Sequence, residues 1–336
     1  MSKDQTYSLN ILDLDDAVEV PVKKRISVLP WLGSTDFKFH YDGVIASVGY
    51  ETRSSFIAKT LKMQSNQKYA CAFDNNKVHS YFDNLTWYES QGFLIQEQSE
   101  TEFSSWCEDL FFRLSEDAGE RTVRVVIDIS SMTRFRIAAL LAAIFDSNGE
   151  FDIDFLYAPS RFNPPTDEDE APIVVCKPVM DKWAGWSMKP DNPSLALFGL
   201  GYESDRALGA LEYIEPGSVW AFLPTGGDQR YDRALLRANK TFLESVPKSH
   251  LFEYGVAEPV ECFTKLEALV YGNLESTKPI LVPFGPKIFA LNCLLVACVY
   301  FPSVAVWRVS AGVFAPPQDK LANGQIIGVR VQFGAF

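Results

Sequence analysis

Histidine is scarce in this chain of 336 residues: only His40, His79 and His250 occur, without metal-ligand spacing or a neighbouring Cys/His cluster. A zinc or iron site is therefore not expected, and we predict neither a metal nor a cofactor. The Walker loop and the G-x-S-x-G elbow are absent, and Gly199-Leu200-Gly201 lacks the third glycine of the dinucleotide fingerprint. Without a familiar catalytic motif, the sequence leaves open whether the protein is an enzyme.

Positive charge is also in short supply. With 31 Lys and Arg against 43 Asp and Glu, the net charge of −12 argues against general nucleic-acid binding. It does not exclude a small anionic ligand, because the charge of a pocket is local. The longest apolar run, around 288–301, is too short to span a bilayer, and the chain begins with polar residues. Six cysteines without C-x-x-C spacing indicate buried free thiols, so we expect a cytoplasmic protein with no membrane partner.

What the sequence does contain is an internal repeat. The heptapeptide that begins at Ser47 (S-V-G-Y-E-T-R) returns at Gly199 (G-L-G-Y-E-S-D), an offset of 152 residues. The segment 158–165 returns at 310–317 with the same offset. Two landmarks with one offset predict two copies of one domain, at 41–180 and 195–336, with an N-terminal extension over 1–40. Such copies often pack about a pseudo-twofold axis, which makes a shared cleft the natural place for a site.

Both copies alternate apolar strand patterns with helical patterns. Strands are expected in the first copy over 44–48, 68–73, 93–96, 123–129, 151–157 and 173–179. The second copy predicts strands over 195–200, 218–223, 251–256, 280–284, 304–309 and 325–333. This alternation predicts an α/β fold of two tandem Rossmann-like parallel-sheet units that form a pseudo-dimer. The β-branched run over 123–129 is typical of a central strand buried on both faces.

The turn after the first strand is one candidate site, because ligands of open parallel sheets bind beyond the carboxyl ends of the strands. It comprises Gly49, Tyr50, Glu51, Thr52 and Arg53. Glycine allows a ligand to approach the backbone, the helix start adds free N–H groups, and Arg53 could neutralise a phosphate. The alternative is an ordinary turn in which Glu51 favours the helix dipole and Arg53 is solvated.

The turn after the fourth strand is the other candidate. It brings an acid, three hydroxyls and two arginines to the start of a helix: Asp128, Ser130, Ser131, Thr133, Arg134 and Arg136. Hydroxyl donors, guanidinium charge and a helix dipole together suit a phosphate or nucleotide. The alternative is helix capping by Ser131 or Thr133, with Asp128 paired to a nearby arginine. In the second copy this turn keeps only a basic group, Lys287.

These motifs resemble the ligand-sensing CARF domains of bacterial CRISPR systems, and more closely their fused two-unit relative, the SAVED domain. In that family the turns after the first and fourth strands contact the ligand. The residues that match the fourth-strand pattern of acid, hydroxyls and base are Asp128, Ser130, Ser131, Thr133 and Arg134; those in the first-strand turn are Gly49, Glu51, Thr52 and Arg53. The second copy lacks the acid and the hydroxyls, and no effector domain is recognised in this sequence. The resemblance implies binding of a cyclic or linear oligonucleotide messenger and an effector supplied by a partner protein.

Three functions therefore stay open. The first is binding of an anionic nucleotide-type ligand and signalling to a partner in antiviral defence. Phosphates would then lie on Arg53, Ser131, Thr133, Arg134 and Arg136, with Tyr50 or Tyr202 stacking on a base. The second is hydrolysis of a nucleotide or phosphodiester, with Glu51 or Asp128 as acid or base. The third is a non-catalytic scaffold subunit of a defence complex.

Overall fold

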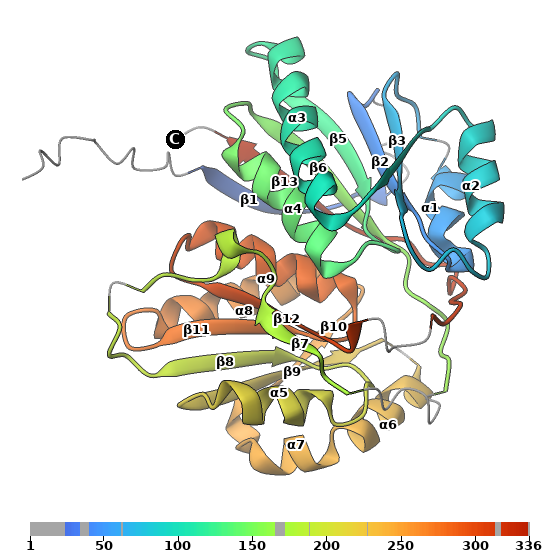
Figure 1. Cartoon of the computed structure of the whole chain (residues 1–336). Coiled ribbons are helices and arrows are strands. Elements are labelled where there is room, and N and C mark those ends of the chain that lie inside the picture. Colours follow the sequence, from blue (N-terminus) through green and yellow to red (C-terminus); the bar gives the residue numbers. More distant parts are fainter. Residues whose placement is uncertain are drawn as a thin grey trace, which may run out of the picture.

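The protein contains two α/β units that lie one above the other in Figure 1. The computed structural model describes residues 24–33, 40–61, 63–164, 172–187, 189–226, 228–312 and 317–334. Of the expected N-terminal extension, residues 1–23 and 34–39 lie outside these ranges, as do residues 313–316 of the second repeat landmark. Among the helices of the described ranges, none combines the length and the hydropathy that crossing a bilayer would take.

The first unit contains a seven-stranded sheet. Its spatial order is β1 (Arg25–Pro30), β13 (Ile327–Gly334), β6 (Phe151–Tyr157), β5 (Val123–Asp128), β2 (Gly43–Val48), β3 (Lys68–Phe73) and β4 (Leu94–Gln98). Its helices are η2 (Thr52–Ser55), α1 (Phe56–Leu61), α2 (Tyr81–Ser90), α3 (Glu100–Ala118) and α4 (Arg134–Asp146). The strands from β6 to β4 are parallel, whereas β13 and β1 run antiparallel to their neighbours β6 and β13.

The second unit contains a six-stranded sheet. Its order is β10 (Leu251–Gly255), β9 (Ser218–Thr225), β8 (Ser194–Gly199), β11 (Lys278–Pro283), β12 (Ala305–Ser310) and β7 (Val175–Pro178). Its helices are η4 (Asp181–Trp183), α5 (Arg206–Ile214), α6 (Gln229–Ala238), α7 (Lys240–Ser245), η5 (Lys248–His250), α8 (Pro259–Asn273) and α9 (Lys287–Val299). Again the strands are parallel except the last, because β7 runs antiparallel to β12.

The two sheets have one topology, which confirms the predicted fold. In each unit the first strand lies in the middle, the second and third follow on one side, and the fourth and fifth on the other. This is the doubly wound order of Rossmann folds, in which the winding reverses between the first and fourth strands. The switch points are therefore between β2 and β5 in the first unit and between β8 and β11 in the second.

The closing strands are exchanged between the units, and this corrects the predicted boundaries. β7 belongs to the first repeat by sequence but pairs with β12 of the second sheet. β13 belongs to the second repeat but pairs with β6 of the first sheet. The strand pattern predicted both elements but not the strands with which they pair. A strand of this kind can pair with the edge of any sheet that its connection can reach. The ranges 41–180 and 195–336 therefore do not each contain a complete sheet.

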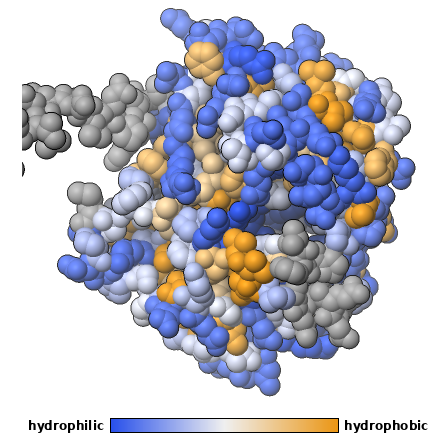
Figure 2. Space-filling model, in the orientation of Figure 1, coloured by the Kyte–Doolittle hydropathy of each residue, from blue (hydrophilic) through white to orange (hydrophobic). Residues whose placement is uncertain are grey.

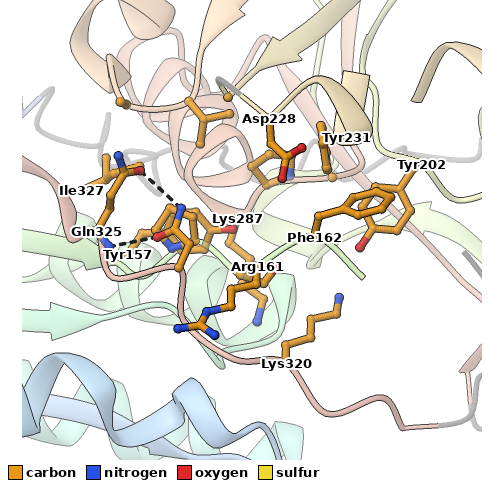
Figure 3. A pocket seen from close by; sticks show the side chains of 18 of the residues that line it. Tyr157, Arg161, Phe162, Tyr202, Asp228, Tyr231, Lys287, Lys320, Gln325 and Ile327 are labelled. Atoms are coloured by element: carbon orange, nitrogen blue, oxygen red, sulfur yellow. Dashed lines mark hydrogen bonds between the residues drawn. The ribbon is translucent and has the colours of Figure 1, made fainter. Parts of the chain in front are cut away.

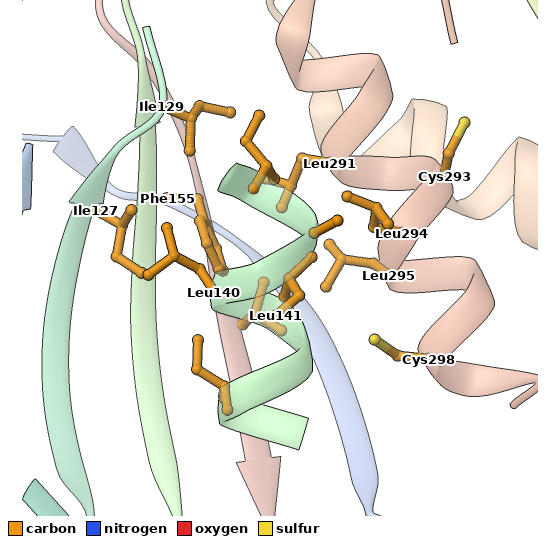
Figure 4. Close-up of a cluster of buried hydrophobic side chains, with 14 of the residues drawn as sticks. Ile127, Ile129, Leu140, Leu141, Phe155, Leu291, Cys293, Leu294, Leu295 and Cys298 are labelled. Carbon is orange, nitrogen blue, oxygen red and sulfur yellow. The ribbon is translucent and has the colours of Figure 1, made fainter. Parts of the chain in front are cut away.

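Four helices form a common layer between the two sheets. In the first unit, the side chains of β5 alternate between the two faces of the sheet. Val125 and Ile127 face the common helix layer, and Val126 faces the outer helices. Helix α4 is buried almost all round, since its residues 136–145 are all buried. It lies between the sheet and α9, whose Leu291, Leu294 and Leu295 contact it in Figure 4. Together with α3 and α8, these helices join both units into one hydrophobic cluster.

Candidate functional site

A pocket of about 920 Å3 opens where the carboxyl ends of both sheets meet. The first unit lines it with residues that follow β2, β5 and β6, and the second with residues that follow β8, β9, β10 and β11. The segment 318–327, which leads into the exchanged strand β13, supplies a third wall. Both switch points thus open into one pocket. In the space-filling view, hydrophilic and hydrophobic residues both occur on the face where the units meet (Figure 2).

The starts of α4 and α9 meet at this pocket in a reciprocal arrangement. Arg134, the first residue of α4, donates from Nη2 to the Gly285 carbonyl just before α9, at 3.4 Å. Lys287, the first residue of α9, donates from Nζ to the Ser130 carbonyl just before α4, at 2.6 Å. Both side chains line the pocket. Each unit therefore presents a helix N-terminus and a basic side chain to the other unit.

The two helix starts differ in their caps. The Thr133 hydroxyl accepts a hydrogen bond from the Arg136 amide and caps α4. Pro286 precedes α9 and offers no side-chain cap, so the partial positive charge of this helix start is not offset by a capping oxygen. Burial lowers the pKa of Lys287 to about 7. The Glu51 carboxylate opposes that shift.

Basic side chains outnumber acidic ones around the pocket, although the whole chain is strongly acidic. In the described part of the chain the lining residues are Arg53, Arg134, Arg161, Arg230, Lys287 and Lys320 against Glu51, Glu203, Asp228 and Glu258. Two of the arginines are already paired. Arg53 bonds to Glu51 at 2.7 Å, and Arg230 bonds to Asp228 at 2.8 Å. Four basic side chains then remain, Arg134, Lys287, Arg161 and Lys320, against the two acids Glu203 and Glu258. Figure 3 labels three of the four, Lys287, Arg161 and Lys320.

The pair of Glu51 and Arg53 is a buried structural element of the first turn. The side chain of Arg53 is 4% exposed, and its Nη1 donates to the Ala158 carbonyl at 2.8 Å. Burial alone would raise the pKa of Glu51, but the charges of Lys287 and Arg53 outweigh it and hold that pKa at about 2. The expectation of a solvated Arg53 is therefore wrong. Arg53 does line the pocket, with its Nε and Nη1 already bonded to protein acceptors.

Gly49 packs closely against the protein, and its backbone does not face the open pocket. A Cβ at this position would lie 2.9 Å from the Ser131 Cβ, so glycine lets the two switch-point turns pack together. Asn84 holds the same turn, donating to the carbonyls of Gly49 and Glu51. Thr52 turns outward and bonds through its amide and its hydroxyl to the Asp319 carboxylate.

The second candidate turn divides between the pocket and the protein interior. Arg134 lines the pocket, whereas Asp128 and Ser130 are 2% and 0% exposed. Asp128 accepts the Ser130 amide at 2.8 Å, and the Ser130 hydroxyl accepts the Ala158 amide. Burial raises the pKa of Asp128 to about 6, although the hydrogen bonds from Ser130 lower it. Ser131 reaches Glu51 at 3.4 Å.

Arg136 is a structural residue, which corrects its assignment to the ligand. It is 1% exposed and donates to the carbonyls of Cys71, Ala72 and Gln98 at the ends of β3 and β4. Its guanidinium lies 3.8 Å from the Phe73 ring centroid. Helix periodicity explains the separation from Arg134: two residues turn a side chain by more than half a turn of the helix.

Tyr202 lines the pocket, whereas Tyr50 lies beside His79, 6.1 Å between ring centroids. Of the residues predicted for the site, five line the pocket: Glu51, Arg53, Arg134, Tyr202 and Lys287. The predicted residues that lie elsewhere are Gly49, Tyr50, Thr52, Asp128, Ser130, Ser131, Thr133 and Arg136.

The structure adds lining residues that the sequence did not indicate. They include Arg161 and Phe162 after β6, Lys320 before β13, and Tyr231 at the start of α6. Arg161 and Phe162 lie in the segment 158–165, which recurs at 310–317. That recurrence was the sequence feature that could have pointed to them. Lys320 had no signal, because its place depends on the strand exchange.

Within the described ranges, no group of three or more His, Cys, Asp or Glu side chains is placed to hold a metal ion. All six cysteines are free, and five of them are buried.

No protein-family model matches this chain, and no curated protein matches it. Similar solved structures include one described as a universal stress protein from Pseudomonas aeruginosa, with 8% identity, covering 80% of this chain and 92% of that chain at a TM-score of 0.23. Another is leucoanthocyanidin reductase with NADPH from Vitis vinifera, with 10% identity, covering 83% of this chain and 96% of that chain at a TM-score of 0.23. Similarities this distant carry no argument about the site.

Proposed function

We propose that this protein binds an anionic nucleotide-type ligand in the pocket between its units and signals the bound state to a partner protein. The observation that carries the proposal is the reciprocal placement of Arg134 and Lys287. These side chains begin α4 and α9, each contacts the turn of the other unit, and both line the pocket.

Electrostatics favours an anion at this place. Two helix N-termini add partial positive charge to that of the two side chains. Among the described atoms, the buried Nε of Arg134 has no hydrogen-bond acceptor, and its Nη2 makes only a long contact of 3.4 Å to Gly285. A phosphate between Arg134 and Lys287 would supply acceptors to both and offset the cost of holding two cations in a partly buried space.

The same placement suggests how binding could become a signal. A phosphate held by Arg134 and Lys287 contacts both units at once, and α4 and α9 pack directly against each other. A ligand shifts a conformational equilibrium only by its difference in affinity for the two states. One that needs both helix starts would favour the arrangement in which they are close, and a partner that contacts both units could detect it.

Hydrolysis is less well supported than binding. A carboxylate with a pKa of about 2 is a weak base, and Glu51 is already bonded to Arg53. Asp128 has a pKa of about 6, which suits acid–base work, but it is buried and is not among the described residues that line the pocket. We therefore propose binding without turnover.

The role in antiviral defence is proposed on the resemblance to CARF and SAVED domains alone. It specifies the ligand class to test first, cyclic oligonucleotides, and an effector as the partner. The scaffold role remains the alternative if the pocket proves empty of ligand in solution.

Calorimetric titration with cyclic dinucleotides and cyclic trinucleotides tests the proposal. We expect at least one of them to bind, and chromatography of the same mixture after prolonged incubation to recover it intact. Consumption of the nucleotide would favour the hydrolase instead. If the protein binds none of these compounds, the ligand-binding proposal is rejected in favour of the scaffold.

A further inference from the structure

Three aromatic rings form one wall of the pocket, which we call the aromatic wall: Phe162, Tyr202 and Tyr231. Phe162 follows β6 of the first unit, Tyr202 follows β8 of the second, and Tyr231 is in α6. Figure 3 shows the rings of Phe162 and Tyr202 beside each other, away from Lys320. Their centroids are 6.3 Å apart.

The rings of the aromatic wall do not stack on one another. Phe162 and Tyr202 are inclined by 60°, and Tyr202 and Tyr231 by 82°. A tilted or edge-on pair leaves more ring face uncovered than a parallel stack does. All three are only half-buried, whereas Phe222 and Phe289 in the adjacent core are fully buried. Tyr231 also packs against the hydrophobic cluster of the second unit, but Phe162 and Tyr202 belong to none of the core clusters, so core packing does not account for these two rings.

A cation and an acid flank the wall on the side of α6. The Arg230 guanidinium lies 5.3 Å from the Phe162 ring centroid and is paired with the Asp228 carboxylate. This pair covers part of Phe162 from one side. The pocket volume of about 920 Å3 is near the upper end of small-molecule sites, which span about 300–1,000 Å3. The space thus exceeds what a phosphate at Arg134 and Lys287 would fill.

We propose that the aromatic wall is a base subsite, on which a nucleobase of the ligand stacks while its phosphates lie at Arg134 and Lys287. This inference rests on the proposed function and adds to it the residues that hold the base of the ligand. Because Phe162 and Tyr202 come from different units, the base contacts both units, as the phosphate does.

The test compares ligands with and without a base. Cyclic di-AMP and ATP carry adenine, and tripolyphosphate offers charge without a base. Each is titrated into the wild type, into Phe162→Ala, and into Phe112→Ala, a control that removes an exposed ring from α3. We expect an adenine nucleotide to bind more tightly than tripolyphosphate. Phe162→Ala should weaken it about 5- to 150-fold, as loss of one base–aromatic stack does, and leave tripolyphosphate and the control unchanged.

Two failures can be told apart. If tripolyphosphate binds as tightly as the nucleotides, and Phe162→Ala affects neither, the base subsite is wrong while the anion site stands. If neither nucleotide nor tripolyphosphate binds, the proposed function fails and the subsite with it. Should Phe162→Ala not fold, Phe162→Leu keeps the apolar volume, removes the ring, and must give the same selective loss.

Discussion

Lys287 is the residue at which charge and function are most closely linked. Its amine lies at a helix start among other cations, and burial brings its pKa to about 7. A bound anion favours the ammonium form, so binding takes up a proton wherever the free amine is neutral. Affinity for an anion must therefore fall as pH rises above about 7.

This pH dependence is testable with a ligand that does not itself titrate. A cyclic dinucleotide carries only phosphodiesters, so between about pH 6 and about pH 9 its charge is constant. We expect its affinity for the wild type to decrease across this range. Lys287→Gln should bind more weakly at the acidic end and show no such decrease. A wild type with constant affinity would mean that Lys287 does not face the ligand.

At the residue scale, sequence reasoning located the switch-point turns but not the direction of each side chain. Arg134 and Arg136 are two positions apart and equally basic, yet one lines the pocket and the other bonds to β-strand carbonyls. Ser130 and Asp128 are buried, and they bond to each other and to the Ala158 amide at the end of β6. Such outcomes depend on contacts between turns that are about 80 residues apart, which a single sequence does not show.

At the scale of elements, β13 is the strand with the most distant partner. Arg330 on this strand holds Asp154 of β6 by two hydrogen bonds of 2.8 Å, and the Asp154 side chain is 1% exposed. Tyr41 completes the cluster with a hydrogen bond of 2.6 Å. A buried carboxylate that loses its cation is left uncompensated.

Arg330→Ala should therefore lower the free energy of unfolding by about 3–5 kcal/mol, the usual cost of removing one partner of a buried pair. Gln332→Ala is the matched control, because Gln332 lies on the same strand and donates a solvent-exposed hydrogen bond to Asp152. Denaturant titration of both variants measures the difference. Equal stability of the two would show that Arg330 does not secure β13 in the first sheet.

The strand and helix patterns predicted most elements of both units, because apolar runs such as that of β5 are covered on both faces. They could not predict the exchange of β7 and β13. β7 is a short edge strand without a buried residue, and β13 is a next-to-edge strand with alternating burial. Neither pattern specifies which of two similar sheets accepts the strand.

We expect the two units to unfold together as one cooperative unit. The first sheet needs β13 from the C-terminal end, the second needs β7, and one hydrophobic cluster runs through the helices between them. Calorimetry should therefore show a single transition whose calorimetric and van't Hoff enthalpies agree. A fragment that ends at residue 187 should not fold, because without β13 the edge of β6 is exposed and β1 has no neighbour. Two separate transitions, or a folded fragment, would contradict the exchange.

If an anionic nucleotide binds where the two units meet, Arg134→Ala should weaken its binding. Calorimetric titration compares the wild type and this variant with Arg113→Ala, which removes an exposed arginine from α3. Ser131→Ala serves as a second control, since Ser131 does not occur among the described residues of the pocket lining. We expect Arg134→Ala to weaken nucleotide binding by about 1.5–3 kcal/mol, the value of a hydrogen bond to a charged group. Both controls should bind as the wild type does, and all variants should keep its melting temperature. Equal binding by the wild type and Arg134→Ala would contradict the claim.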